Sequence, residues 1–260
     1  MTDLLRHIRA CNNAVLPGGR LTLRLGPDAV GWVRPALKPV LQGLGMTVGD
    51  EAVLPPGRMQ AVARGLAEAG LFRWRDEAFD VRAAPDGPVL DVVDRGALPL
   101  LGIQAEGVHL NGLVRRGDSW WVWVARRAAD KLLDPGKLDH IVGGGVPAGL
   151  TPGETLVKEA EEEAGLSPEL CAGARHVGTA SYAMERPEGL RRDRLHMYDL
   201  VLPDGFVPEP RDGEVAGFEL WPAADVLDRV RRTDDFKFNV NLVLIGLFER
   251  LGMLTPGKGR

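Results

Sequence analysis

Residues 143–166 read GGGVPAGLTPGETLVKEAEEEAGL and are the most informative segment of the chain. Thr151, Pro152 and Glu154 predict a helix start, because threonine can cap it, proline fits its first turn and Glu154 can close a capping box. Gly165 supplies a left-handed stop. The helix is therefore expected over residues 152–164. Its apolar stripe has the helical period and consists of Leu156, Val157, Ala160 and Ala164.

Three carboxylates lie next to each other on one face of this predicted helix. Glu159, Glu162 and Glu163 stand at i, i+3 and i+4, where each like-charged pair costs roughly a few tenths of a kcal/mol. A divalent cation would remove that repulsion. Magnesium (or manganese) fits best, since it takes oxygen ligands and shares its remaining positions with water and phosphate. Bound there, it would draw charge from a phosphorus centre and lower the pKa of an attacking water.

The alternative is that this helix simply shows a solvated face, which is the usual meaning of a glutamate-rich run. The glycines on either side of the helix favour the metal site over this alternative. The glycines of residues 143–145 allow the backbone to pass close to the helix, and Gly165 fixes its exit.

At these residues the chain resembles the Nudix family, whose box reads G, five residues, E, seven residues, R-E-U-x-E-E-x-G-U, with U aliphatic. The matching positions are Gly144, Glu159, Ala160, Glu162, Glu163, Gly165 and Leu166. Leu150 stands where the family has its first glutamate, and Lys158 stands where it has an arginine that organises neighbouring carboxylates. The resemblance implies a metal-dependent hydrolase with Glu159, Glu162 and Glu163 as metal ligands and catalytic residues.

The resemblance extends beyond the box to one subfamily. GVHLNGLV, PGKLDHIVGGGVPAGL, MYDLVLP, DGEVAGFELWP and FKFNVNLVLIGLFERLG are similar to Nudix proteins that carry an N-terminal domain of unknown function, and to the Nudix portion attached to some thiamine pyrophosphokinases. VGWVRP and WRDEAFDV extend the likeness towards the N-terminus. It implies that diphosphates of damaged heterocycles, either oxidised thiamine diphosphates or 8-oxo-dGDP, are cut to monophosphates.

Further residues are candidates for the same site. Glu214 precedes a predicted strand where Nudix enzymes often place another carboxylate, so it could be a catalytic base or an exposed loop residue. Arg127 resembles a substrate-contacting arginine of related enzymes, with an ordinary surface arginine as the alternative. Gly144 and Lys237 are the other predicted substrate-binding residues, although Lys237 could simply solvate a helix start.

Several more side chains are weaker candidates. Asp139, His140, His109 and Asn111 are candidates to line the mouth, although a lone histidine is more often structural. Tyr182, Trp120 and Trp121 could stack on a heterocycle or pack in the core. Arg191, Arg192 and Arg194 are interpreted as a solvated loop.

The fold class expected is α/β: a Nudix α/β/α sandwich with a mixed sheet in residues 105–260, preceded by a small α+β domain in residues 1–104. Residues 107–114 and 119–125 should form a hairpin, followed by strands at 176–184, 194–202 and 218–221. Helices are expected at 223–231 and 239–251. In the first part, helices are expected at 2–10, 36–44 and 58–69, a strand at 20–25 and paired strands within 71–81.

The composition of the chain restricts the classes of partner that it is expected to bind. The formal charge of −4 over 260 residues gives no support for binding a nucleic-acid polymer. Two distant cysteines, Cys11 and Cys171, predict reduced thiols, and no apolar run is long enough for a signal or a membrane span. We expect a cytoplasmic protein that acts on a small phosphorylated metabolite, and a homodimer remains open. The rival functions are an ADP-ribose or nucleoside triphosphate pyrophosphatase and a catalytically silent nucleotide-binding module.

Overall fold

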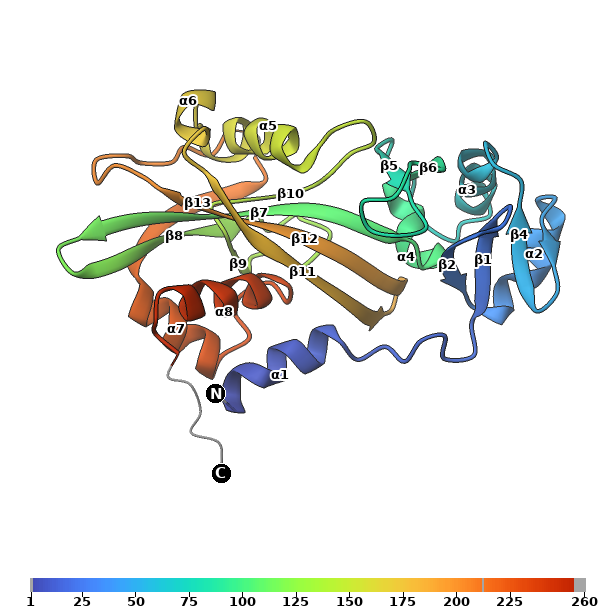
Figure 1. Cartoon of the computed structure of the whole chain (residues 1–260), viewed down its shortest axis with the longest axis horizontal. Coiled ribbons are helices and arrows are strands. Elements are labelled where there is room, and N and C mark those ends of the chain that lie inside the picture. The colour runs from blue at the N-terminus through green and yellow to red at the C-terminus, as the bar shows by residue number, and fades with distance from the viewer. Residues whose placement is uncertain (1, 212, 255–260) are drawn as a thin grey trace.

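The computed structural model describes residues 2–211 and 213–254. A seven-stranded mixed sheet occupies one end of the molecule, and an N-terminal α+β region occupies the other (Figure 1). The strands of the large sheet are β7 (Gln104–Arg116), β8 (Ser119–Arg127), β9 (Leu138–Asp139), β10 (Val142–Gly145), β11 (Arg175–Arg186), β12 (Gly189–Val201) and β13 (Val215–Pro222). The mixed α/β architecture predicted from the sequence is confirmed.

The long strand β7 organises this sheet. The main order is β11-β12-β7-β8-β13, while β10 also pairs with β7 and β9 with β8. β12 runs parallel to β7, and the other pairings are antiparallel. The predicted hairpin of residues 107–125 is present and is longer than expected. Because β10 pairs with β7, its glycines are held directly beneath the predicted carboxylate helix.

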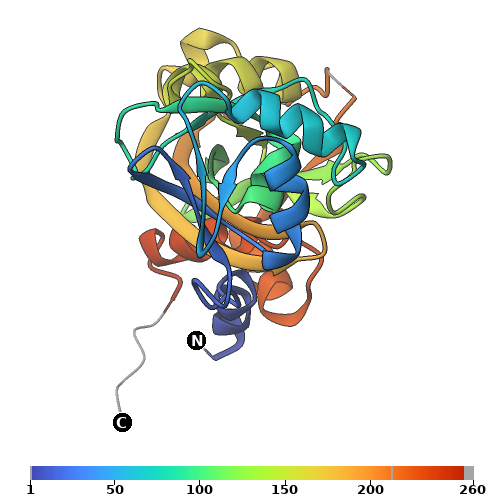
Figure 2. The ribbon, with the colours of Figure 1, turned by 90° about the vertical axis from the view of Figure 1, so that its right-hand side faces the viewer.

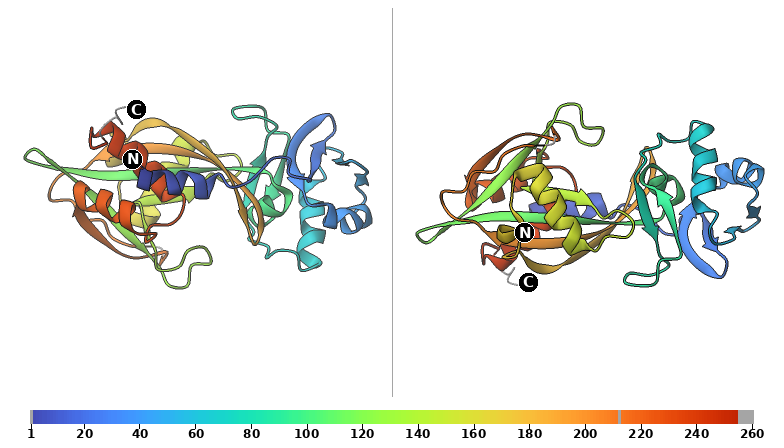
Figure 3. Two further views of the ribbon diagram at one scale, coloured as in Figure 1. Left: turned by 90° about the horizontal axis from the view of Figure 1, so that it is seen from below. Right: turned by 90° about the horizontal axis from the view of Figure 1, so that it is seen from above.

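Helices cover both faces of the sheet (Figure 3). On one face lie α5 (Pro152–Ala164) and α6 (Pro168–Cys171), packed on an apolar cluster that includes Val108, Leu156 and Leu166. On the other lie α7 (Ala223–Arg232) and α8 (Val240–Arg250), packed around Phe236 and Phe248. The two closing helices therefore form where the sequence predicts them.

The N-terminal region has its own apolar core. Its strands are β1 (Leu21–Leu25), β2 (Asp28–Val33), β3 (Thr47–Val48), β4 (Glu51–Leu54), β5 (Ala78–Val81) and β6 (Asp91–Asp94). Its helices are η1 (Pro35–Leu37), α2 (Lys38–Gly43), α3 (Met59–Glu68), η2 (Arg95–Ala97) and α4 (Leu98–Leu101). The fully buried side chains of Leu23, Leu41 and Leu66 tie the sheet to the helices. Figure 2 shows this region end-on, in front of the large sheet.

The first helix, α1 (Thr2–Cys11), packs elsewhere. Leu4 belongs to the apolar cluster around α7 and α8. The His7 ring lies 2.8 Å from the carbonyl oxygen of Val230, and the Arg6 guanidinium also donates to that carbonyl. These contacts place α1 against the C-terminal helices, although it precedes the N-terminal region in sequence. A domain boundary near residue 104 remains a prediction.

Two local expectations are wrong. Residues 71–77 are irregular, and only β5 within the expected pair of strands forms, with β6 as its partner. Arg191, Arg192 and Arg194 are not a solvated loop: all three lie in β12. Arg192 stacks on Trp32, with 4.3 Å to the ring centroid, and Arg194 pairs with Asp86 at 2.7 Å. Both partners lie more than 100 residues earlier in the sequence, so the local sequence gave no sign of them.

Candidate functional site

Helix α5 begins and ends where its sequence predicts. The Thr151 hydroxyl accepts from the amide of Glu154, and a Glu154 carboxylate oxygen accepts from the Thr151 amide at 2.9 Å, so both halves of the capping box are present. Gly165 closes the helix at φ 65°. Leu156, Ala160 and Ala164 are buried beneath it. The capping box and Gly165 therefore set the two ends of the helix, and with them the positions of its glutamates along it.

Glu159 lies directly over the glycine strand. A Cβ placed on Gly144 would come within 2.5 Å of the Glu159 carboxyl carbon, so any side chain at this position would displace the carboxylate. The Glu159 side chain is 18% exposed. Burial raises the pKa of Glu159, while Lys158 opposes that rise. Gly144 thus forms a cradle for a partly buried carboxylate, and a bound cation would stabilise its charged form.

Lys158 shows that two of the carboxylates can share one cation. Its ammonium nitrogen lies 2.7 Å from an oxygen of Glu162 and 3.3 Å from an oxygen of Glu159. The ammonium therefore stands where a cation between these two carboxylates would be bound. Carboxylate oxygens open to solvent on one side suit magnesium, which retains several waters. The residues fit the predicted metal.

Glu163 turns towards the interior. It is 7% exposed, and one of its carboxylate oxygens accepts from the backbone amide of Gly143 at 2.8 Å. The three glutamates are therefore not a compact ligand set around one point. One ion held by all three would require Glu163 or Lys158 to change rotamer.

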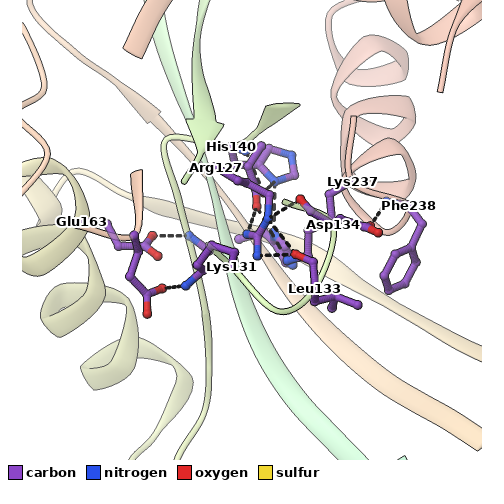
Figure 4. A network of polar contacts seen from close by, with 12 residues as sticks. Arg127, Lys131, Leu133, Asp134, His140, Glu163, Lys237 and Phe238 are labelled. Carbon is purple, nitrogen blue, oxygen red and sulfur yellow. Dashed lines mark hydrogen bonds and ion pairs between the residues drawn. The ribbon is translucent and has the colours of Figure 1, made fainter. Parts of the chain in front are cut away.

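Glu163 lines a small pocket with residues from four other segments (Figure 4). The pocket residues are Ala125, Arg127, Lys131, Asp139, His140, Gly143, Glu163, Glu214 and Val215. Glu214 is half exposed and forms an ion pair with Lys131. Its backbone carbonyl accepts from Ala128 at 2.9 Å. The structure therefore brings Glu214 and Glu163 to one pocket, as their predicted shared role requires.

Arg127 is engaged by the loop that follows β8. Its guanidinium donates to the carbonyl oxygens of Leu133 and Asp134, and to a carboxylate oxygen of Asp139 at 2.7 Å. The side chain is only 11% exposed. In this conformation Arg127 holds the loop against the pocket, so a substrate contact would require exchange of these partners. Lys131, carried by the same loop, was not identified from the sequence.

Lys237 lies behind the pocket rather than at its mouth. Its ammonium nitrogen is 3.7 Å from the Asp139 carboxylate, and the residue is 9% exposed. Burial lowers the pKa of Lys237. In this structure Lys237 therefore reaches the pocket through Asp139.

His109, Asp139 and His140 form the only compact three-ligand set found within the described parts of the chain. The two Nδ1 atoms of the histidines lie 3.0 Å apart, so one ring donates to the other. Burial lowers the pKa of His140 to about 4 and that of His109 well below its ordinary value. Both rings are consequently neutral near pH 7.

The negative charge of Asp139 is already balanced by two cationic side chains, Arg127 and Lys237. Burial alone would raise its pKa, but Lys237 and Arg127 hold the pKa of this carboxyl well below its ordinary value. Two imidazoles and a carboxylate would suit a transition metal better than magnesium. A cation here would face two fixed positive charges, however, so the set is better explained as a buried hydrogen-bonded support for the pocket.

The aromatic candidates lie away from the pocket. Tyr182 is buried, its hydroxyl donates to Asp193, and its ring packs edge-on against Phe238. Trp120 and Trp121 lie near the turn between β7 and β8, under Arg115 and Arg116 respectively. Core packing therefore explains Tyr182, and the tryptophans pack at the far end of the hairpin.

Comparison with known proteins identifies the family of the chain. Residues 107–241 match the family model described as the NUDIX domain. The chain belongs to the Nudix family. It is 40% identical over 206 residues to Nudix hydrolase 20, chloroplastic, from Arabidopsis thaliana, covering 78% of this chain and 55% of that protein. Nudix hydrolase 24, chloroplastic, from the same plant is 41% identical over 206 residues, covering 78% and 56%.

One solved structure shows the same Nudix fold. DR0079 from Deinococcus radiodurans is 21% identical and superposes with a TM-score of 0.52, covering 65% of this chain and 98% of its own. The present chain spans just over half the length of the curated plant relatives. Those relatives are named as chloroplastic, so a cytoplasmic location stays a prediction for this Nudix protein. Among the described residues, no helix is long and apolar enough to cross a membrane.

Proposed function

We propose that this chain is a magnesium-dependent hydrolase that cleaves the diphosphate bond of a small phosphorylated metabolite. One observation carries the proposal: Glu159 and Glu162 share a single cation, the Lys158 ammonium, beside the Gly144 cradle. Membership of the Nudix family and relatives named as hydrolases support it.

Each carboxylate has a distinct part in this reaction. Glu159 and Glu162 would hold the ion, and Glu163 would join them if its carboxylate left the Gly143 amide. When bound, magnesium withdraws charge from the phosphorus centre and lowers the pKa of an attacking water. Glu214 and Glu163 line the pocket from opposite segments, so either can accept the proton of that water. Arg127 lines the same pocket and would steady the substrate phosphates in exchange for its present partners.

The substrate class follows from the resemblance described above. We infer that the substrate is the diphosphate of a damaged heterocycle, either an oxidised thiamine diphosphate or 8-oxo-dGDP, and that the products are the monophosphate and phosphate. ADP-ribose or a nucleoside triphosphate is the alternative substrate. The pocket is narrow, and Lys131 is among the residues that line it.

A substrate panel with product identification by mass tests the proposal. The wild-type protein, with magnesium, should release phosphate from the oxidised thiamine diphosphates or from 8-oxo-dGDP faster than from ADP-ribose. The double variant Glu162→Gln and Glu163→Gln should lose at least about a thousandfold in turnover, because the metal contribution to catalysis disappears. Unchanged turnover would refute the metal site, and magnesium-dependent binding of a nucleotide without hydrolysis would favour the silent module.

A further inference from the structure

Lys131 brings a positive charge to the pocket from the loop that follows β8 (Figure 4). Its ammonium forms an ion pair with the carboxylate of Glu214, one of the two candidate bases. Backbone hydrogen bonds join the two segments that carry this pair: the Ala128 amide donates to the Glu214 carbonyl at 2.9 Å, and the Lys131 amide donates to the Ala128 carbonyl at 3.3 Å. The backbone of Lys131 is therefore held beside Glu214, whichever partner the ammonium takes.

The rest of this loop is also anchored. The Arg127 guanidinium donates to the carbonyl oxygens of Leu133 and Asp134. The Asp134 carboxylate accepts from the backbone amide of Phe238 at 3.4 Å. A lysine ammonium, in contrast, stands on a flexible four-carbon stem. A change of partner at Lys131 consequently requires only rotation of its side chain, while the loop backbone stays in place.

The two cations that line the pocket differ in how strongly they are tied to their carboxylates. Arg127 pairs with Asp139, and these side chains are 11% and 8% exposed. Separating such a buried pair leaves a charge without compensation. Lys131 and Glu214 are 22% and 51% exposed, and an ion pair open to water contributes little because water replaces the lost contact. Among the described pocket residues, Lys131 is therefore the cation that an incoming anion recruits at the lower cost.

A change of partner at Lys131 also suits the role assigned to Glu214. A carboxylate oxygen that accepts a hydrogen bond from an ammonium is a poorer acceptor for the proton of a water molecule. A phosphate oxygen is a strong acceptor, and lysine binds it as a point charge. When a phosphate group takes over the ammonium, the Glu214 oxygen becomes available. Arrival of the phosphate and readiness of this base are then linked.

We propose that Lys131 is a substrate-binding residue whose ammonium passes from Glu214 to a phosphate oxygen of the bound diphosphate. The ammonium keeps its protons, so one ion pair is exchanged for another. This inference rests on the proposed function, because it concerns the same pocket and names a further contact to the substrate. It gives the loop after β8 a part in recognising the diphosphate group, which is common to all the substrates considered above.

Binding of methylene diphosphonate, a diphosphate analogue whose bridge cannot be hydrolysed, tests this without turnover. In isothermal titration calorimetry with magnesium present, Lys131→Met should weaken binding about tenfold, the lower end of what a hydrogen bond to a charged group contributes. Lys131→Arg keeps the charge and should recover most of the loss. Glu214→Gln should tighten binding about twofold, because the competing partner of a weak ion pair is gone.

Lys137→Met is the matched control. Lys137 belongs to the same loop, but its ammonium donates to the Asp234 carbonyl at 2.9 Å. The variant should bind the analogue as the wild type does, and all four variants should keep the wild-type melting temperature.

The outcomes separate this inference from the proposed function. Wild-type affinity in Lys131→Met, or an equal loss in Lys137→Met, overturns the role of Lys131 even if the protein hydrolyses diphosphates. Weaker binding in Glu214→Gln also overturns it, because the two residues would then hold the ligand together instead of competing. A protein that binds the analogue through Lys131 but cleaves nothing in the substrate panel supports the inference and refutes the hydrolase.

Discussion

Two groups of charged side chains make up the candidate site, and they are built in opposite ways. The carboxylate face of α5 is formed by Glu159 and Glu162, which lie on one helix. The Glu162 side chain is half exposed. The buried support of the pocket consists of Asp139, Arg127 and Lys237, which come from three separate segments. The first group is held in place by helix geometry, and the second by its own charge balance. A substitution should therefore affect metal binding in the first group and folding in the second.

Asp139→Asn should show the largest effect. It removes the only negative charge found to pair with both Arg127 and Lys237 among the described contacts, which leaves two buried cations uncompensated. Breaking a buried pair from one side costs about 3–5 kcal/mol. The free energy of unfolding, measured by urea titration, should fall by that amount, whereas Asp118→Asn at the exposed hairpin turn should leave it unchanged. A loss below 1 kcal/mol, roughly a surface pair's value, would show that this support is not held together by charge.

Acidification should weaken the same support. The folded-state pKa of His140, about 4, lies below its ordinary value of 6.5, because the ring is buried and lies near Lys237. Below pH 6.5 the unfolded chain therefore binds more protons, and stability falls as the pH drops towards 4. Between pH 6.5 and 5 this costs about 2 kcal/mol for one histidine.

Unfolding free energies measured across that range test the pH effect. In His140→Asn, the decrease of the unfolding free energy over this pH range should be smaller by about 2 kcal/mol, the contribution of one buried ring. His176→Asn, which alters an exposed histidine, should keep the wild-type fall. An identical pH dependence in His140→Asn would mean that the ring becomes protonated in the folded protein at the ordinary pH.

The two groups also differ in how far the sequence could predict them. The capping box and Gly165 set the bounds of α5, and each of these signals lies within a few residues of the helix it defines. His109 and His140 are 31 residues apart, and Arg194 and Asp86 are 108 apart. Such contacts depend on strand pairing, which a single sequence does not encode locally. For the same reason Lys131 carried no signal in its own segment, and the sequence predicted Arg127 and Lys237 without their partners.

The smallest expected effect concerns Lys158. It decides whether the carboxylate face, like the buried support, depends on charge balance. If its ammonium competes with the metal for Glu159 and Glu162, Lys158→Met should tighten Mn²⁺ binding about twofold, the equivalent of a half-exposed i,i+4 pair worth about 0.3–0.5 kcal/mol. Lys137→Met, at a partly exposed lysine in the loop before β9, is the matched control. Weaker binding in Lys158→Met would instead mean that the lysine organises the carboxylates, as the arginine does at this position of the Nudix box. The metal face would then depend on charge balance just as the buried support does, and the contrast between the two groups would be one of exposure alone.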